Sequence, residues 1–260
     1  MIFDTYNCSA NPFAEHISLN SLYLDERVST AINSLKHLPE LGDLATLTGR
    51  TGQGKTTVAR KLMEYWRPNY DVYYVHLGNL KGAGLFRAIL TTLGEIPRMG
   101  KDRMFQQLFA QLSKKQRPIC LIMDEAQLMD IPSMTDLRLL CGNLELMGRL
   151  KLILSGQPQM GKTLKAESLT DFRERLTLQI NLKPMTMVET ISYMEHRLRI
   201  VGGKLNIFEE DALKLIANYG EGVPRRVNTL AFKSMLNAAQ KGEKCIDATC
   251  VREVCSAEST

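Results

Sequence analysis

The stretch from Leu44 to Thr57, LATLTGRTGQGKTT, constrains the fold of this chain more than any other stretch. Its first five residues are apolar and β-prone, which predicts a strand, and helical periodicity follows from Thr57 to Trp66. Between them lies GRTGQGKT, which fits the pattern G-x-x-x-x-G-K-[ST]. Glycines let the backbone turn tightly, so that successive N–H groups can point at an anion in front of a helix N-terminus. This strand–loop–helix unit predicts a binding site for a nucleotide phosphate.

The residues of this P-loop are expected to have separate roles. Lys55 would reach the β- and γ-phosphates of ATP, and the Thr56 hydroxyl would ligate Mg²⁺. The whole predicted nucleotide-binding set is Gly49, Arg50, Thr51, Gly52, Gln53, Gly54, Lys55, Thr56 and Thr57. The alternative is a glycine-rich turn before a helix that binds no ligand.

A second informative run is PICLIMDE, residues 118–125. It predicts a buried strand that delivers two carboxylates at its C-terminal end, where open α/β sheets place their ligands. Asp124 would hold Mg²⁺, and Glu125 would orient and activate the attacking water. An acidic pair at the end of a strand means little by itself. Together with the upstream P-loop it predicts an ATP hydrolase.

Four further polar residues are candidates for the same site. Gln157 follows the next strand, which we expect to neighbour the strand of Asp124, so its side chain would contact the γ-phosphate or the water. Arg173 and Arg175, in DFRER, would act as arginine fingers on a neighbouring subunit's nucleotide. Arg225, in GVPRR, opens a later helix and would sense the γ-phosphate in cis. The alternatives are a turn residue for Gln157 and surface charges for Arg173 and Arg175.

The order of the predicted elements indicates two domains. Strands are expected at 44–48, 71–77, 118–125, 150–155 and 178–182, and helices at 24–38, 57–66, 82–93, 102–113 and 133–147. This alternation predicts an α/β fold with a largely parallel sheet. After Pro184 only helices are expected, at 186–201, 209–219, 224–240 and 248–256, the first opened by a capping box at Thr186 and Glu189. We therefore expect an α/β nucleotide-binding domain over residues 1–183, including an irregular N-terminal lead-in, and a small helical domain over residues 184–260.

Composition limits the cellular setting. A net charge of +5 permits nucleic-acid binding without requiring it. The six cysteines form no C-x-x-C pair and no zinc ligand set, so we expect them to be reduced. No apolar run approaches a membrane span and the N-terminus is not a signal peptide, which predicts a cytoplasmic protein without a membrane contact.

These motifs occur in the order found in AAA+ ATPases: the P-loop, LIMDEAQ, LSGQP, FRERL, EHRLRIVG and EGVPRRVN. The chain most resembles the ExeA-type branch and its relatives among the transposition helper ATPases (TnsC/TniB/IstB-like), from about Asn11 to its end. The resemblance implies a P-loop AAA+ core with a parallel five-stranded sheet, followed by an all-helical lid. It also implies ATP at subunit interfaces of a ring or helical homo-oligomer. In this family Gln157 would correspond to sensor 1, Arg225 to sensor 2, and Arg173 or Arg175 to the finger.

Secretion-type members of the branch continue into a membrane span and a peptidoglycan-binding region, whereas this chain ends at Thr260. We therefore expect a stand-alone relative that assembles with ATP on duplex DNA and recruits or activates a transposase at its target site. The alternatives are a secretion or pilus-assembly ATPase whose membrane part is another protein, and a nucleotide-gated switch that binds only protein.

Contacts with DNA are expected to be made to the phosphate backbone, with weak sequence preference, because no base-reading motif is present. The predicted DNA-binding residues follow the second strand and are Lys81, Arg87, Arg98, Lys101 and Arg103. Solvated surface charges are the alternative for each of them.

Overall fold

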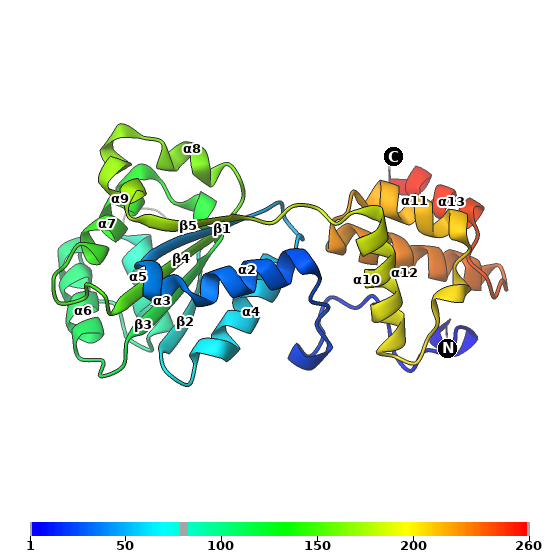
Figure 1. Ribbon diagram of the computed structural model, residues 1–260, viewed down its shortest axis with the longest axis horizontal. Coiled ribbons are helices and arrows are strands. Elements are labelled where there is room, and N and C mark those ends of the chain that lie inside the picture. Colours follow the sequence, from blue (N-terminus) through cyan, green and yellow to red (C-terminus); the bar gives the residue numbers. More distant parts are fainter. Residues whose placement is uncertain (1, 79–82, 259–260) are drawn as a thin grey trace. The chain divides into compact units, whose positions relative to one another are not determined.

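The computed structural model describes residues 2–78 and 83–258, and the chain divides into two compact units (Figure 1). The α/β unit comprises residues 28–51 and 55–182. The helical unit comprises residues 1–27, 52–54 and 183–260.

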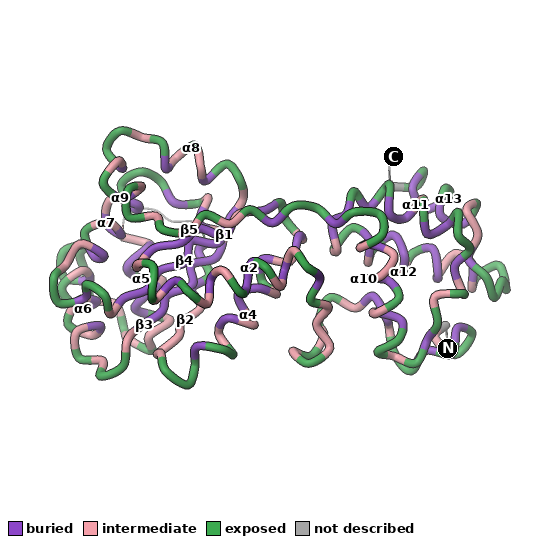
Figure 2. Tube along the Cα trace, viewed as in Figure 1, coloured by how far each residue is buried: buried purple, intermediate pink, exposed green. Residues whose placement is uncertain are grey.

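The α/β unit is built on one sheet of five strands. They are β1 (Leu44–Thr48), β2 (Asp71–His76), β3 (Ile119–Asp124), β4 (Leu150–Gly156) and β5 (Leu176–Asn181). The strand order is β2-β3-β4-β1-β5 and every neighbouring pair is parallel (Figure 1). Strands β3 and β4 are buried along their whole length, as Figure 2 shows in purple, which explains their unbroken apolar sequences. The predicted parallel five-stranded sheet is confirmed.

Helices cover both faces of this sheet. Side chains of a strand point alternately to opposite faces, so an apolar strand has side chains to bury on both. Ile119, Leu121 and Met123 of β3 pack in one core, whereas Cys120 and Ile122 pack in the other. The first core includes residues of α5 (Gly84–Thr92), α6 (Lys101–Ser113) and α7 (Ile131–Cys141). The second core includes residues of α2 (Glu26–Lys36), α3 (Leu38–Leu41) and α4 (Lys55–Trp66). Two short helices, α8 (Met160–Leu164) and α9 (Thr170–Glu174), lie between β4 and β5 in the chain.

One predicted helix is shorter than expected. The pattern predicted a helix to residue 147, but α7 ends at Cys141. The side chain of Asn143 accepts a hydrogen bond from the backbone N–H of Glu145 at 2.9 Å, and such local bonds compete with helix continuation. Leu144, which the predicted helix included, is 83% exposed.

In its described residues, the helical unit contains four long helices: α10 (Met187–Arg199), α11 (Glu210–Gly220), α12 (Pro224–Gln240) and α13 (Ala248–Glu258). The predicted capping box of α10 is present, because Thr186 accepts from the Glu189 N–H and Glu189 accepts from the Thr186 N–H. Among the residues that the structure describes, no helix combines the length and apolarity needed to cross a bilayer.

The N-terminal lead-in belongs to the helical unit, whereas we had expected it to accompany the α/β domain. Tyr6 and Phe13 are buried in the helical core, next to α1 (Ile2–Thr5). The buried guanidinium of Arg197 donates to the carbonyl oxygens of Pro12 (2.7 Å) and Ala14 (2.5 Å). Nothing local in the sequence predicted this grouping, because it depends on aromatic burial against helices more than 180 residues later.

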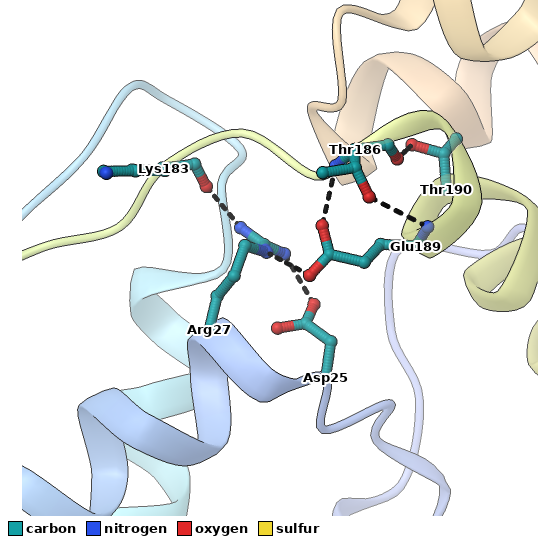
Figure 3. A network of polar contacts seen from close by, with 6 residues as sticks. All are labelled: Asp25, Arg27, Lys183, Thr186, Glu189 and Thr190. Carbon is teal, nitrogen blue, oxygen red and sulfur yellow. Dashed lines mark hydrogen bonds and ion pairs between the residues drawn. The ribbon is translucent and has the colours of Figure 1, made fainter.

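A charged network joins residues 25–27 to residues 183–189, two segments of the helical unit that are far apart in the sequence. The guanidinium of Arg27, at the start of α2, donates to the Lys183 carbonyl at 2.5 Å and to Asp25 at 2.6 Å (Figure 3). It also lies 4.0 Å from Glu189, the capping carboxylate of α10. The first turn of α10 is thereby tied to residues 25–27.

Candidate nucleotide-binding site

The P-loop places Lys55 inside the turn that the glycines form. Gly52 and Gly54 have φ angles of +82° and +103°, a region that favours glycine. Helix α4 begins at Lys55, two residues earlier than predicted, and the Lys55 side chain is buried. Its ammonium donates to the carbonyl oxygens of Gly49 (2.9 Å) and Arg50 (3.2 Å). The positive charge is therefore held within the loop, at the N-terminus of a helix, where both the charge and the helix dipole favour an anion.

Asp124, at the end of β3, is buried and accepts hydrogen bonds on both carboxylate oxygens. The Ser155 hydroxyl on β4 donates to Oδ1 at 2.9 Å, and the Tyr74 phenol on β2 donates to Oδ2. The Tyr74 phenol also lies next to the side chain of Thr56, the second residue of α4. Burial, and then the Asp124 carboxylate, raise the pKa of the phenol, so it remains a hydrogen-bond donor at neutral pH.

The two predicted metal ligands are brought together by this chain of contacts. Tyr74 donates a hydrogen bond to Asp124 and lies next to the Thr56 side chain, although Thr56 and Asp124 lie on different elements of the α/β unit. A hydroxyl and a carboxylate are hard oxygen donors, which Mg²⁺ prefers. The residues present therefore fit this ion. Tyr74 and Ser155 were missed by sequence reasoning, because their only signal was membership of ordinary strand patterns.

Glu125 follows directly and has a left-handed backbone, with φ +59° and ψ +33°. For a residue with a side chain this conformation costs on the order of 1 kcal/mol, and such residues concentrate at functional sites. Its carboxylate accepts a hydrogen bond from the Gln127 amide at 2.5 Å. Gln127 was not among the predicted site residues, although it is the last letter of the motif LIMDEAQ.

Gln157 lies just beyond β4, and β4 pairs with β3 as predicted. Its backbone N–H donates to the Gln127 side chain at 2.9 Å, and its own side chain accepts from Gln159 at 3.0 Å. The described contacts therefore place its backbone, through Gln127, next to the acidic pair.

The structure distinguishes the two candidate finger arginines. Arg175 donates to the carbonyl of Cys141 at 3.1 Å, at the C-terminal end of α7, where a cation is favoured. Arg173, on α9, is half-buried, and within residues 2–78 and 83–258 its guanidinium has no hydrogen-bond or ion-pair partner. Arg225 is in the first turn of α12 and forms an exposed ion pair with Glu15 at 2.7 Å.

The predicted DNA-binding residues have unequal surroundings. Lys81 lies outside the described residues. Arg87 on α5, and Arg98 and Arg103 around the start of α6, are exposed. The ammonium of Lys101 lies 2.8 Å from the Asp136 carboxylate of α7, so its charge is already compensated locally.

The sheet order, the P-loop after β1 and the acidic pair after β3 define a P-loop AAA+ fold. Residues 40–164 match a family model described as "AAA domain" (AAA_22). The chain is 28% identical over 247 residues to General secretion pathway protein A of Aeromonas hydrophila, an alignment that covers 91% of this chain and 45% of that protein. The chain therefore spans less than half the length of this relative.

Two solved structures share the fold. The ORC2 protein of Aeropyrum pernix in its ADP form has a TM-score of 0.71 at 18% identity, covering 94% of this chain and 71% of that chain. Drosophila ORC bound to DNA has a TM-score of 0.65 at 18% identity, covering 93% of this chain and 63% of that chain. The predicted AAA+ fold is confirmed, and the similarity to a general secretion pathway protein A agrees with the expected likeness to the ExeA-type branch.

Proposed function

We propose that this chain binds ATP and Mg²⁺ at the P-loop and hydrolyses the nucleotide. The observation that supports this most strongly is the contact chain in which Tyr74 joins Thr56 to Asp124. Thr56 and Asp124 are of the residue types that hold a nucleotide-bound Mg²⁺, and both lie at the edge of the sheet where the P-loop begins.

The proposed chemistry assigns one task to each residue. Lys55 and the loop N–H groups bind the phosphates, and Thr56 and Asp124 hold Mg²⁺, which neutralises charge on the phosphate oxygens. Glu125 accepts a proton from the attacking water while the water oxygen bonds to the γ-phosphorus. The bond from that phosphorus to the β–γ bridging oxygen breaks, leaving ADP and phosphate.

Three residues are proposed to complete the site. Gln157 would contact the γ-phosphate or the water, and Arg225 would act as the sensor in cis. Arg173 is the better candidate for the finger that reaches a neighbouring subunit of a homo-oligomer, because Arg175 is engaged at the end of α7. Arg173 lacks such a partner within the described part of the chain.

We further propose that the ATP-bound oligomer, ring or filament, assembles on duplex DNA and serves a transposase as a regulator of target choice. Support for the DNA part comes from exposed Arg87, Arg98 and Arg103, and from the fold shared with Drosophila ORC bound to DNA. The transposase part rests on the sequence resemblance. A second candidate, an ATPase of secretion or pilus assembly, is favoured by the similarity to General secretion pathway protein A.

Two substitutions test the nucleotide site. Lys55→Ala should abolish ATP binding, because it removes the buried ammonium from the loop. Glu125→Gln should retain ATP binding and lower the hydrolysis rate by about 100-fold or more, because an amide cannot accept the proton from water. Isothermal titration with ATP and a phosphate-release assay measure the two effects.

Lys61→Ala is the matched control, since it removes the same charge from the same helix at a lysine that pairs with Glu64. Unchanged ATP affinity in Lys55→Ala, or normal hydrolysis by Glu125→Gln, would contradict the assignment. Electron microscopy with duplex DNA and a slowly hydrolysed ATP analogue separates the two finer candidates. Assemblies that form only on DNA support the first, and assemblies indifferent to DNA support the second.

A further inference from the structure

Gln127 contacts two residues of the proposed site with the two ends of one amide. It lies in the 3-10 turn Ala126–Leu128, directly after the acidic pair. Its Nε2 donates to Oε2 of Glu125 at 2.5 Å, and its Oε1 accepts the backbone N–H of Gln157 at 2.9 Å. A backbone N–H only donates and an ionised carboxylate only accepts, so this orientation of the amide is the one that satisfies both partners.

The end of β4 is shaped around this side chain. A Cβ atom on Gly156 would lie 2.8 Å from Oε1 of Gln127 and 3.1 Å from its backbone nitrogen. At 2.8 Å one of the two groups would have to shift, and the movable one is the Gln127 amide, whereas the 3.1 Å contact with the backbone nitrogen is tight. Glycine at residue 156 lets the strand lie this close to Gln127 without such a shift. The absence of a side chain at Gly156 therefore allows the end of β4 to lie directly against Gln127.

Glu125 itself is held in an unusual conformation. Its left-handed backbone sets the direction of its side chain, and its carbonyl accepts the N–H of Leu128 at 2.9 Å to close the turn. The hydrogen bond from Gln127 then holds one carboxylate oxygen, which leaves Oε1 to accept the proton of a water molecule.

We propose that Gln127 is a positioning residue that holds the Glu125 carboxylate against the end of β4, and so ties its orientation to the Gln157 segment. This inference rests on the proposed ATPase function. Gln127 acts through Glu125 and need not touch the nucleotide. Its loss should therefore affect the rate of hydrolysis and leave ATP affinity unchanged.

The first test is Gln127→Leu, which removes both hydrogen bonds at similar side-chain volume. We expect kcat to fall between about 10-fold and 100-fold, because a small misplacement of a catalytic group is enough for such a loss. KM and the affinity for ATP should stay within about twofold. Gly156→Ala, which pushes against the same amide, should lower kcat in the same way. Gln106→Leu, at an exposed glutamine of α6, is the matched control and should leave both constants unchanged.

The second test is the double variant Glu125→Gln/Gln127→Leu. If Gln127 acts through Glu125, the double variant should hydrolyse ATP as slowly as Glu125→Gln alone. The inference would be overturned if the fold-decreases in kcat of the two single variants multiplied in the double variant. A normal kcat in Gln127→Leu, or a fall in ATP affinity that matches the fall in kcat, would also overturn it. Wild-type protein without ATPase activity, or a fully active Glu125→Gln, would instead overturn the proposed function. Melting temperatures of all variants identify any that fail to fold.

Discussion

At the residue scale, Tyr74 joins the P-loop helix to the acidic strand. Its phenol donates a hydrogen bond to Asp124 and lies next to the Thr56 side chain, and Ser155 donates to the other carboxylate oxygen of Asp124. Groups that orient metal ligands in this way contribute to metal affinity even though they do not touch the ion. Tyr74 is therefore expected to affect how ATP affinity depends on Mg²⁺.

Tyr74→Phe keeps the ring and removes the hydroxyl. The concentration of Mg²⁺ that gives half of the maximal gain in ATP affinity should rise by about 10-fold, because Thr56 and Asp124 lose their common partner. ATP affinity in excess EDTA should not change. Fluorescence titration with a labelled ATP analogue at a series of Mg²⁺ concentrations measures both quantities.

Tyr73→Phe is the control on the same strand. Its side chain points to the opposite face, where the Lys115 ammonium lies over its ring, 5.4 Å from the centroid. Removing the Tyr73 hydroxyl should leave the Mg²⁺ dependence unchanged. Equal Mg²⁺ dependence in Tyr74→Phe and the wild type would show that the phenol has no positioning role.

At the element scale, the start of α7 depends on a charged N-cap. Asp130 accepts the backbone N–H of Ser133 at 2.8 Å. Hydrogen bonds from the Ser133 hydroxyl and N–H hold the pKa of Asp130 below its usual value of 3.8. A carboxyl whose pKa is lower in the folded state stabilises the fold above its unfolded pKa, and this stabilisation is lost as the pH falls through the folded pKa.

Asp130→Ala should therefore lower the free energy of unfolding by about 1 kcal/mol at pH 7. The difference in the free energy of unfolding between the wild type and Asp130→Ala should shrink as the pH is lowered below 3.8. Trp66, the single tryptophan, is buried in the α/β unit, so its fluorescence during urea unfolding reports on that unit. Asp130→Asn keeps an acceptor that does not titrate and should retain most of the stability at every pH. If the difference in the free energy of unfolding between wild type and Asp130→Ala is constant from pH 7 to pH 3, the charge of Asp130 does not contribute to its role as N-cap.

At the scale of the whole molecule, the proposed DNA contact depends on several basic residues acting together. If Arg87, Arg98 and Arg103 each neutralise one phosphate, replacing all three by alanine should reduce the slope of log affinity against log salt by about one per contact. Anisotropy of a labelled duplex, measured with a slowly hydrolysed ATP analogue over a range of NaCl concentrations, gives this slope.

The matched control replaces three exposed basic residues of the helical unit, Arg199, Lys204 and Lys244, so that the net charge changes equally. Backbone contacts at α5 and α6 would be excluded if the affinity for DNA did not depend on salt, or if the slope fell equally in both triple variants. The first result would also favour the secretion-type alternative.

Local features of the sequence predicted most of the fold. The P-loop turn, the periodicity of α4 and α12, and the unbroken apolar runs of β3 and β4 are short-range signals, so the strands and the long helices were expected close to their observed bounds. One error has a local cause: α7 ends early because the Asn143 side chain accepts a hydrogen bond from the backbone N–H of Glu145. The N-terminal lead-in packs elsewhere because its aromatic residues are buried by α12 and its neighbours.

For this protein, residue types and their spacing were enough to predict which side chains would carry the proposed chemistry, namely Lys55, Thr56, Asp124 and Glu125, because they form motifs within continuous segments. The supporting side chains, by contrast, could be identified only from the way the chain folds. Tyr74 and Ser155 reach Asp124, and Gln127 reaches the Gln157 backbone, because β2, β3 and β4 are adjacent and parallel, with their carboxyl ends at one edge. Strand adjacency is a non-local property, set by the packing of helices on both faces of the sheet. No spacing along the chain encodes it.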